Sequence, residues 1–117
     1  MSKAECFEDL RIWQEARQFV KLIYTDFREN KDYGFCSQIQ RAGVSVMNNI
    51  AEGFERNSDA DFARFLDMAK GSAGEVRSMY YSAEDLGYVS LETANERRMF
   101  AQTISKGIGA LEGYLRK

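Results

Sequence analysis

The sequence predicts an all-α protein in which a single antiparallel up-down-up-down four-helix bundle spans the 117 residues. Apolar residues recur at spacings of three and four along the chain, which is typical of amphipathic helices. No segment alternates apolar and polar residues as a half-buried strand does. The chain also lacks proline, the strongest helix breaker. Because this length suits one domain and is too short for two, we expect one domain over residues 1–117.

Three clusters rich in Gly, Asn, Ser and Asp, at residues 30–34, 57–59 and 86–90, divide the chain. The resulting helices are expected at residues 7–30, 35–56, 59–86 and 91–116. Ser58 or Asp59 can cap the third helix, and Ser90 begins the fourth. Gly87 is suited to a left-handed C-terminal cap of the third helix.

Several helices carry a second apolar line beside their main stripe. In the first helix the main stripe is Leu10, Trp13, Ala16, Val20, Ile23 and Phe27. The second lines are Ile12, Phe19 and Leu22 in the first helix, Met68, Met79 and Tyr81 in the third, and Met99, Phe100 and Tyr114 in the fourth. An apolar surface of this width predicts a buried face between copies of the chain. The alternative is a large core with a few exposed aromatic residues.

Composition excludes several classes of function. The chain contains no histidine, which excludes Ser-His-Asp and Cys-His catalysis and His-ligated metal sites. Two cysteines, Cys6 and Cys36, lack CxxC spacing, so we expect free thiols in a reducing cytoplasm. No apolar run reaches the roughly 18–20 residues of a membrane span, and residues 1–5 do not resemble a signal peptide. We therefore expect no enzyme activity, cofactor, metal, small-molecule substrate or membrane contact.

A polar ridge is expected on the second helix. Spacings of three and four bring Arg41, Ser45, Asn48 and Glu52 onto one face, with Arg56 one turn further. Asn49, which borders the Ile50 side of the helix, is counted with this ridge. The ridge can bind a partner or a phosphate. Alternatively, it is a solvated face with ion pairing such as Glu52 to Arg56, and Asn49 makes a capping or cross-helix hydrogen bond.

Two glycines, Gly71 and Gly74, lie inside the predicted third helix, where each costs about 1 kcal/mol relative to alanine. Close approach of a neighbouring helix across Gly71, Gly74 and Ser78 is the structural explanation. A phosphate-binding loop does not fit, because no strand precedes this segment and no Gly-Lys-Ser/Thr follows it. Glu75 is expected to pair with Arg41 or to remain partly solvated.

Charge places limits on nucleic-acid binding. A net charge of −2 and a pI near 5.2 exclude a uniformly basic surface, although a local basic patch remains compatible with them. The end of the chain has a local excess of cations. Its candidate phosphate contacts are Arg97, Arg98, Lys106, Arg116 and Lys117. The alternative is a solvated helix face.

Four motifs in this order resemble the family of four-helix-bundle proteins encoded in intervening sequences of bacterial 23S ribosomal RNA genes, the S23 family. The motifs are Phe7-x-Asp9-Leu10-x-Ile12-Trp13-Gln14-x-Ala16-Arg17, Ser37-Gln38-Ile39-x-Arg41-Ala42-x-Val44-Ser45, Asn49-Ile50-Ala51-Glu52-Gly53-Phe54-x-Arg56 and Phe62-x-Arg64-Phe65-Leu66-x-Met68-Ala69-Lys70-Gly71-Ser72-Ala73-x-Glu75. The chain is also similar to the accessory variability protein of diversity-generating retroelements.

The resemblance implies a small up-down bundle that assembles as a homopentameric ring, with no known enzymatic activity. It adds Gly53 and Ser72 to Gly71, Gly74 and Glu75 as expected helix-packing positions. We therefore predict a homo-oligomeric interaction scaffold or adaptor. The alternative is an RNA- or ribonucleoprotein-binding module linked to 23S rRNA intervening sequences or reverse-transcriptase complexes, against which the acidic pI counts.

Overall fold

The computed structural model describes residues 4–117, which form an elongated molecule of 44 × 21 × 20 Å. A short 3-10 turn, η1 (Phe7–Asp9), precedes α1 (Arg11–Asp26), α2 (Tyr33–Phe54), α3 (Asp59–Asp85) and α4 (Leu91–Leu115). No strand occurs in this part of the chain, so the prediction of an all-helical protein with four helices is confirmed. Residues 1–3 of the expected domain lie outside the described residues.

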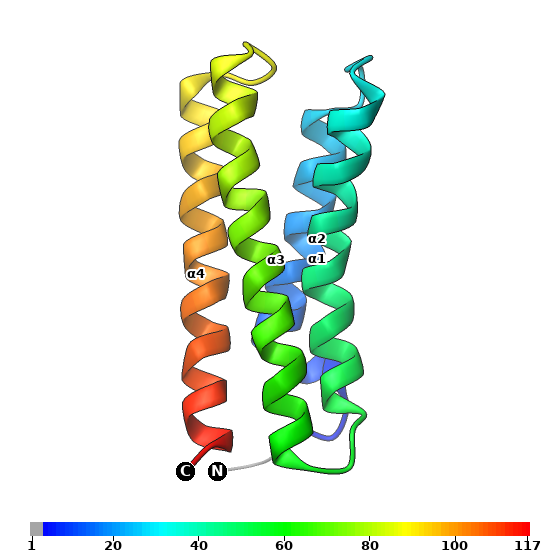
Figure 1. Cartoon of the computed structure of the whole chain (residues 1–117), viewed down its shortest axis with the longest axis vertical. Helices are drawn as coiled ribbons and strands as arrows, with labels where there is room; N and C mark the ends of the chain where they lie inside the picture. Colours follow the sequence, from blue (N-terminus) through cyan, green and yellow to red (C-terminus); the bar gives the residue numbers. More distant parts are fainter. Residues whose placement is uncertain (1–3) are drawn as a thin grey trace.

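The helices lie side by side along the long axis (Figure 1). The α1–α2 and α3–α4 connections lie at one end, and the α2–α3 connection lies at the other together with the end of α4. Each helix packs on the next one in the chain, and α1 also meets α4. Contacts are most extensive between α2 and α3 and between α3 and α4.

Local hydrogen bonds define where the helices begin and end. Ser58 Oγ accepts from the backbone N–H of Asp61 at 3.1 Å, and Ser90 Oγ accepts from Thr93 N–H at 3.0 Å. These side chains satisfy N–H groups that have no partner inside the helix. Gly87 has a φ of 73° and ends α3 in the left-handed conformation expected from the sequence.

The first helix starts later than the sequence predicts. Leu10 is extended, with φ −74° and ψ 125°, so the 3-10 turn does not continue into α1, which begins at Arg11 instead of residue 7. Gln14 Nε2 donates to the carbonyl oxygen of Glu8 at 2.7 Å. The Phe7 ring packs edge-on against Trp13, with 5.1 Å between centroids. These contacts fold the preceding turn onto the side of α1.

The core is built from aliphatic residues around three large aromatic ones, Phe19, Phe27 and Tyr80. On α1 the buried residues are Ile12, Ala16, Phe19 and Ile23. Trp13 and Val20, expected in the main stripe, are only half-buried. Ile12 and Phe19, expected on a second surface, therefore belong to the core. The buried face of α1 is thus rotated from the predicted one, and Trp13 lies at its edge, packed on the preceding turn.

Two helices approach each other closely at Gly53, near the end of α2. A Cβ atom added there would lie 2.8 Å from Cδ1 of Phe62, 2.8 Å from Cβ of Phe65 and 3.2 Å from the carbonyl oxygen of Phe62. The glycine therefore permits α2 and the start of α3 to meet directly, as its assignment as a helix-packing position requires.

A hydrogen bond joins the two connections at the other end of the molecule. Asp32 Oδ1 accepts from the backbone N–H of Phe35 at 3.2 Å and so caps α2. The second carboxylate oxygen, Oδ2, accepts from the Tyr88 hydroxyl at 2.6 Å. The Asp32 carboxylate thus caps the N-terminus of α2 and also binds Tyr88 in the α3–α4 connection. These bonds lower the pKa of Asp32, with the bond from Tyr88 contributing most.

None of the helices within residues 4–117 combines the length and the apolar character that crossing a lipid bilayer requires.

Gly53→Ala is expected to lower the free energy of unfolding by about 1–3 kcal/mol, because the added methyl overlaps Phe62 and Phe65. Gly34→Ala is the matched control, since its Cβ would meet only Asp32 Oδ1 at 4.0 Å. Urea denaturation of both variants measures the difference. Equal stability of the two variants would show that the α2–α3 approach does not require a glycine.

Candidate functional site

The ridge on α2 lines a shallow hollow of about 470 Å³ on the molecular surface. Arg41 and Glu52 are exposed there, whereas Ser45 and Asn49 are half-buried. Tyr24 from α1 forms the opposite wall. The full lining is Tyr24, Arg41, Val44, Ser45, Asn48, Asn49 and Glu52.

Two ridge residues are engaged inside the molecule. The hydroxyls of Ser45 on α2 and Ser72 on α3 are 2.8 Å apart, so one donates to the other. Asn49 Nδ2 donates to the carbonyl oxygen of Ser45 at 2.9 Å and to its hydroxyl at 3.0 Å. This network explains why Asn49 occurs in the middle of a helix and why Ser72 is a packing position. It leaves Arg41, Asn48 and Glu52 as the outward-facing part of the ridge.

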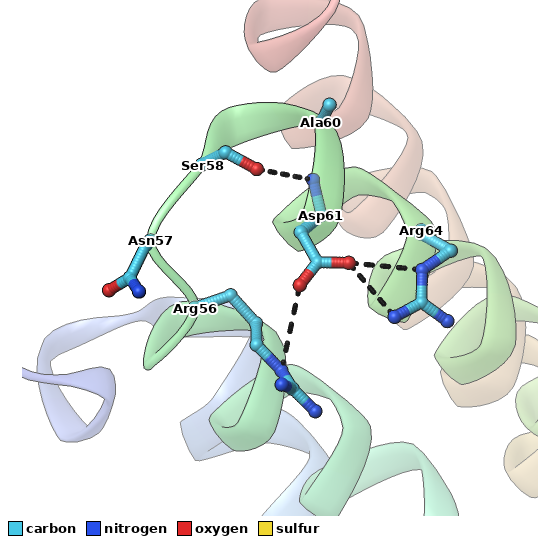
Figure 2. A pocket seen from close by; sticks show the side chains of 6 residues that line it. All are labelled: Arg56, Asn57, Ser58, Ala60, Asp61 and Arg64. Carbon is cyan, nitrogen blue, oxygen red and sulfur yellow. Dashed lines mark hydrogen bonds and ion pairs between the residues drawn. The ribbon is translucent and has the colours of Figure 1, made fainter.

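Arg56 belongs to the α2–α3 connection, away from the hollow in which the other ridge residues gather. Its Nε lies 3.7 Å from Asp61 Oδ2, so the expected ion pair with Glu52 is replaced by one with α3. Arg64 approaches the other oxygen of Asp61 at 2.9 and 3.0 Å, as Figure 2 shows. Both guanidinium groups also lie over the Phe65 ring, at 4.6 and 4.8 Å from its centroid. These contacts stabilise the α2–α3 connection, and they occupy the charged groups that line the hollow in Figure 2.

The expected close helix approach across Gly71 and Gly74 is wrong within this chain. Both glycines are exposed, and a Cβ at either position would meet no atom within 4 Å. The helical phase explains the difference, because Ser72 and Ala73, between them, face α2 and the core. Glu75 is exposed and accepts from Gln38 Nε2 at 3.3 Å, so Arg41 is not its partner.

Three of the five candidate phosphate contacts are neutralised by carboxylates. Arg97 donates to both oxygens of Asp26, at 2.8 and 3.0 Å. Arg98 is buried, pairs with Glu84 at 2.9 Å and stacks 4.0 Å from the centre of the Tyr81 ring. Arg116 pairs with Asp67 at 2.7 Å and with Glu112 at 3.3 Å. Lys106 and Lys117 are exposed. The C-terminal basic residues therefore do not form a continuous phosphate-binding face.

Sequence reasoning missed the polar cluster at Asp26, Tyr80 and Arg97, which links α1, α3 and α4. The Tyr80 hydroxyl donates to Asp26 Oδ2 at 2.7 Å, beside the bidentate contact from Arg97. Burial and the bond to Asp26 raise the pKa of Tyr80 far above its usual value, so the phenol remains a donor. The same carboxylate raises the pKa of Arg97.

A second cluster joins α3 to α4 near the other end. Glu112 is almost fully buried, and its carboxylate lies 3.5 Å from Lys70 Nζ and 3.3 Å from Arg116. Burial is the main cause that raises the pKa of Glu112, and the neighbouring Asp67 adds to it. The hydrogen bond from Arg116 lowers the pKa of Asp67 to about 2. The two carboxylates therefore have opposite shifts.

Another hollow, of about 550 Å³, lies beside the α1–α2 connection and shares Tyr24 with the ridge hollow. Its lining is Tyr24, Phe27, Arg28, Asn30, Tyr33, Cys36, Ser37 and Gln40. Among residues 4–117, no group of three or more Cys, Asp or Glu side chains is placed to hold a metal ion.

Comparison with known proteins identifies the relatives of this arrangement of helices. A profile of the 23S rRNA-intervening sequence proteins matches residues 8–110, which is most of the chain. The chain belongs to this family. No protein among those with curated descriptions matches it.

A solved structure of another protein has a fold similar to that of this 23S rRNA-intervening sequence protein. It is the crystal structure of a protein with unknown function from the S23 ribosomal protein family of Bacteroides thetaiotaomicron. The TM-score is 0.80 at 24% sequence identity, over 86% of this chain and 96% of that one. The resemblance drawn from the sequence motifs is thus confirmed at the level of family and fold.

Removing the Asp26 carboxylate from this family member is expected to cost about 3–5 kcal/mol of unfolding free energy. Asp26→Ala removes the ion pair with Arg97 and leaves that residue charged and largely buried, with only the exposed Glu96 nearby among the described residues, at 3.7 Å. Tyr80→Phe retains that ion pair and is expected to cost only about 1–1.5 kcal/mol. Urea titrations monitored by circular dichroism measure both. If the phenylalanine variant lost as much stability as the alanine variant, the ion pair would not dominate the cluster.

The carboxylates of the second cluster predict opposite effects of acid. The pKa of Asp67 falls from 3.8 to about 2 on folding, so its contribution to stability is present above pH 3.8 and lost as the pH falls toward 2. Asp67→Asn should therefore flatten the acid loss in that window. The pKa of Glu112 rises from 4.5 on folding, so protonation of this carboxyl favours the folded state. The stability of the wild type should therefore increase as the pH falls toward 4.5, and Glu112→Gln should remove this increase.

Stability measured against pH by thermal melting tests both signs, with Glu75→Gln as an exposed carboxylate control. Parallel curves for the Asp67 and Glu112 variants would contradict the assignment.

Proposed function

We propose that this protein is a non-catalytic interaction scaffold, built as an antiparallel up-down-up-down bundle whose subunits assemble into a closed homo-oligomeric ring. The observation that carries the proposal is a set of glycines on the outer sides of α3 and α4. At Gly71, Gly74, Gly109 and Gly113, an added Cβ would meet no atom within 4 Å. The surface of a neighbouring subunit supplies the close contact that the chain itself does not make.

The energetic argument rests on helix propensity. Each glycine in a helix costs about 1 kcal/mol relative to alanine. No atom of the described chain occupies the space beside these four, so no internal contact offsets the cost. Lys70 lies 3.5 Å from Glu112, and each of these residues is next to a glycine pair in the sequence, so the two pairs lie at a similar level along α3 and α4. The glycines therefore define one smooth surface on which another helix can pack closely.

Exposed apolar side chains on the same two helices support this interpretation. Met68 and Tyr81 on α3 are 40% and 53% exposed, and Met99 and Tyr114 on α4 are 58% and 49% exposed. Association with a second subunit removes such surface from water. A closed ring uses one repeated contact and leaves no copy of it unpaired. We propose five subunits, following the resemblance of the sequence motifs.

Interaction, rather than catalysis, suits the surface chemistry. The hollows are shallow, and the most deeply buried charges are engaged with one another in ion pairs between helices. The relative with known structure is itself described as a protein of unknown function. The free thiols of Cys6 and Cys36 suit a reducing compartment, so we propose that the protein acts in the cytoplasm. Protein partners then bind to the outside of the ring.

The purified protein is expected to have a mass in solution near five times the 13.4 kDa of one chain. The double variant Gly71→Gln, Gly74→Gln places two bulky polar side chains on the proposed interface and should yield monomers. Because glutamine favours a helix over glycine, the monomer should not lose helicity. Light scattering after size exclusion, together with circular dichroism, measures both quantities.

Gly34→Gln is the matched control, since Gly34 lies in the exposed first turn of α2. This variant should keep the mass of the wild-type assembly. A monomeric wild-type protein, or an assembly that the double variant leaves intact, would overturn the proposal.

A further inference from the structure

The two hollows that meet at Tyr24 form a strip along α1 and α2, here called the α1–α2 groove. We propose that this groove binds a single-stranded polynucleotide. The residues that carry the inference are Tyr24, Arg28, Tyr33, Gln40, Arg41 and Asn48. The groove lies on different helices from the glycines proposed to form the ring, so the two surfaces can be altered independently.

The cations of the groove are available to a ligand. Arg28 and Arg41 line it and are exposed, and the exposed Lys21 lies one turn before Tyr24 on α1. Over residues 4–117, no carboxylate comes within 4.0 Å of these three charged groups. This contrasts with Arg97, Arg98 and Arg116, whose charges are paired. Positive charge thus remains free on α1 and α2, although the whole chain is acidic.

Aromatic side chains stand among these cations. Tyr24 is 47% exposed and Tyr33 is 73% exposed, and each lines a hollow. Single-stranded nucleic acids bind where cations follow the backbone and aromatic rings stack on successive bases. The polar side chains of Gln40 and Asn48 face the same strip, and neither makes a side-chain hydrogen bond within the described residues. They can therefore bond to base edges.

Other occupants fit less well. An acidic peptide would satisfy the arginines but would leave the exposed tyrosine faces without flat rings to stack on. A DNA duplex keeps its bases stacked inside, so the tyrosines would not contribute. Glu52, the one carboxylate among the lining residues, lies at the end of the groove and bounds the cationic part.

The test is fluorescence anisotropy with a labelled oligouridine of about 12 nucleotides, with the full-length protein at about 50 and 200 mM salt. Each phosphate contact on a single strand contributes about 0.7 to the slope of log affinity against log salt. Arg28→Gln with Arg41→Gln should therefore reduce the slope by about 1.4. Tyr24→Leu should weaken binding several-fold and leave the slope unchanged, because stacking releases no counterions.

Lys106→Gln with Lys117→Gln is the matched control, since it removes two exposed cations, one from α4 and one just after it. This control should bind like the wild type, and oligodeoxythymidine should bind through the same residues. Three results would overturn the inference directly: no binding at the lower salt, an equal loss of affinity in the control variant, or equal affinity for duplex DNA. Displacement of the oligouridine by polyglutamate at equal charge would also overturn it, and would indicate an acidic protein partner.

The same variants separate this inference from the proposed ring. The two arginine substitutions should leave the mass of the assembly unchanged. If they dissociate it, the groove is an interface between copies, and the inference is overturned. Conversely, polynucleotide binding by the Gly71→Gln, Gly74→Gln monomer would support the groove whether or not a ring forms.

Discussion

The placement of α4 against α1 depends on the carboxylate of Asp26, which accepts hydrogen bonds from Arg97 on α4 and from the Tyr80 hydroxyl on α3. The Asp26 and Arg97 side chains are only 8% and 15% exposed, so separating them would leave two charges with little access to water. Helices α1 and α4 otherwise share the least extensive helix contact. Gly107 allows that contact, because a Cβ there would lie 2.8 Å from Cγ2 of Ile12. One polar cluster therefore determines how the first and last helices meet.

This use of charge divides the molecule into two surfaces of different chemistry. The arginines of α4 hold helices together, and the outer sides of α3 and α4 combine glycines with exposed apolar residues. The outer sides of α1 and α2 instead retain free cations beside exposed tyrosines. In the proposed ring, the glycine surface of α3 and α4 would supply one of the two contact surfaces that each subunit needs. A ring would repeat the cations and tyrosines of α1 and α2 once per subunit.

Features that depend on neighbouring residues could be predicted from the sequence. The number of helices, the caps at Ser58 and Ser90 and the left-handed Gly87 follow from local hydrogen bonding and periodicity. The pairing of Arg97 could not be predicted, because its partner Asp26 lies 71 residues away. The outward orientation of Gly71 was missed for a related reason. Spacing alone does not show which side of a long helix another helix covers.

Asp32 has a consequence for local motion. Its carboxylate begins α2 and also holds Tyr88 in the α3–α4 connection, so neither segment can loosen without losing a hydrogen bond of the other. We therefore expect the first turn of α2 and the α3–α4 connection to open together, as one unit, although 56 residues separate Asp32 and Tyr88 in the chain. Amide hydrogen exchange at the two ends of this unit then reports the same opening event.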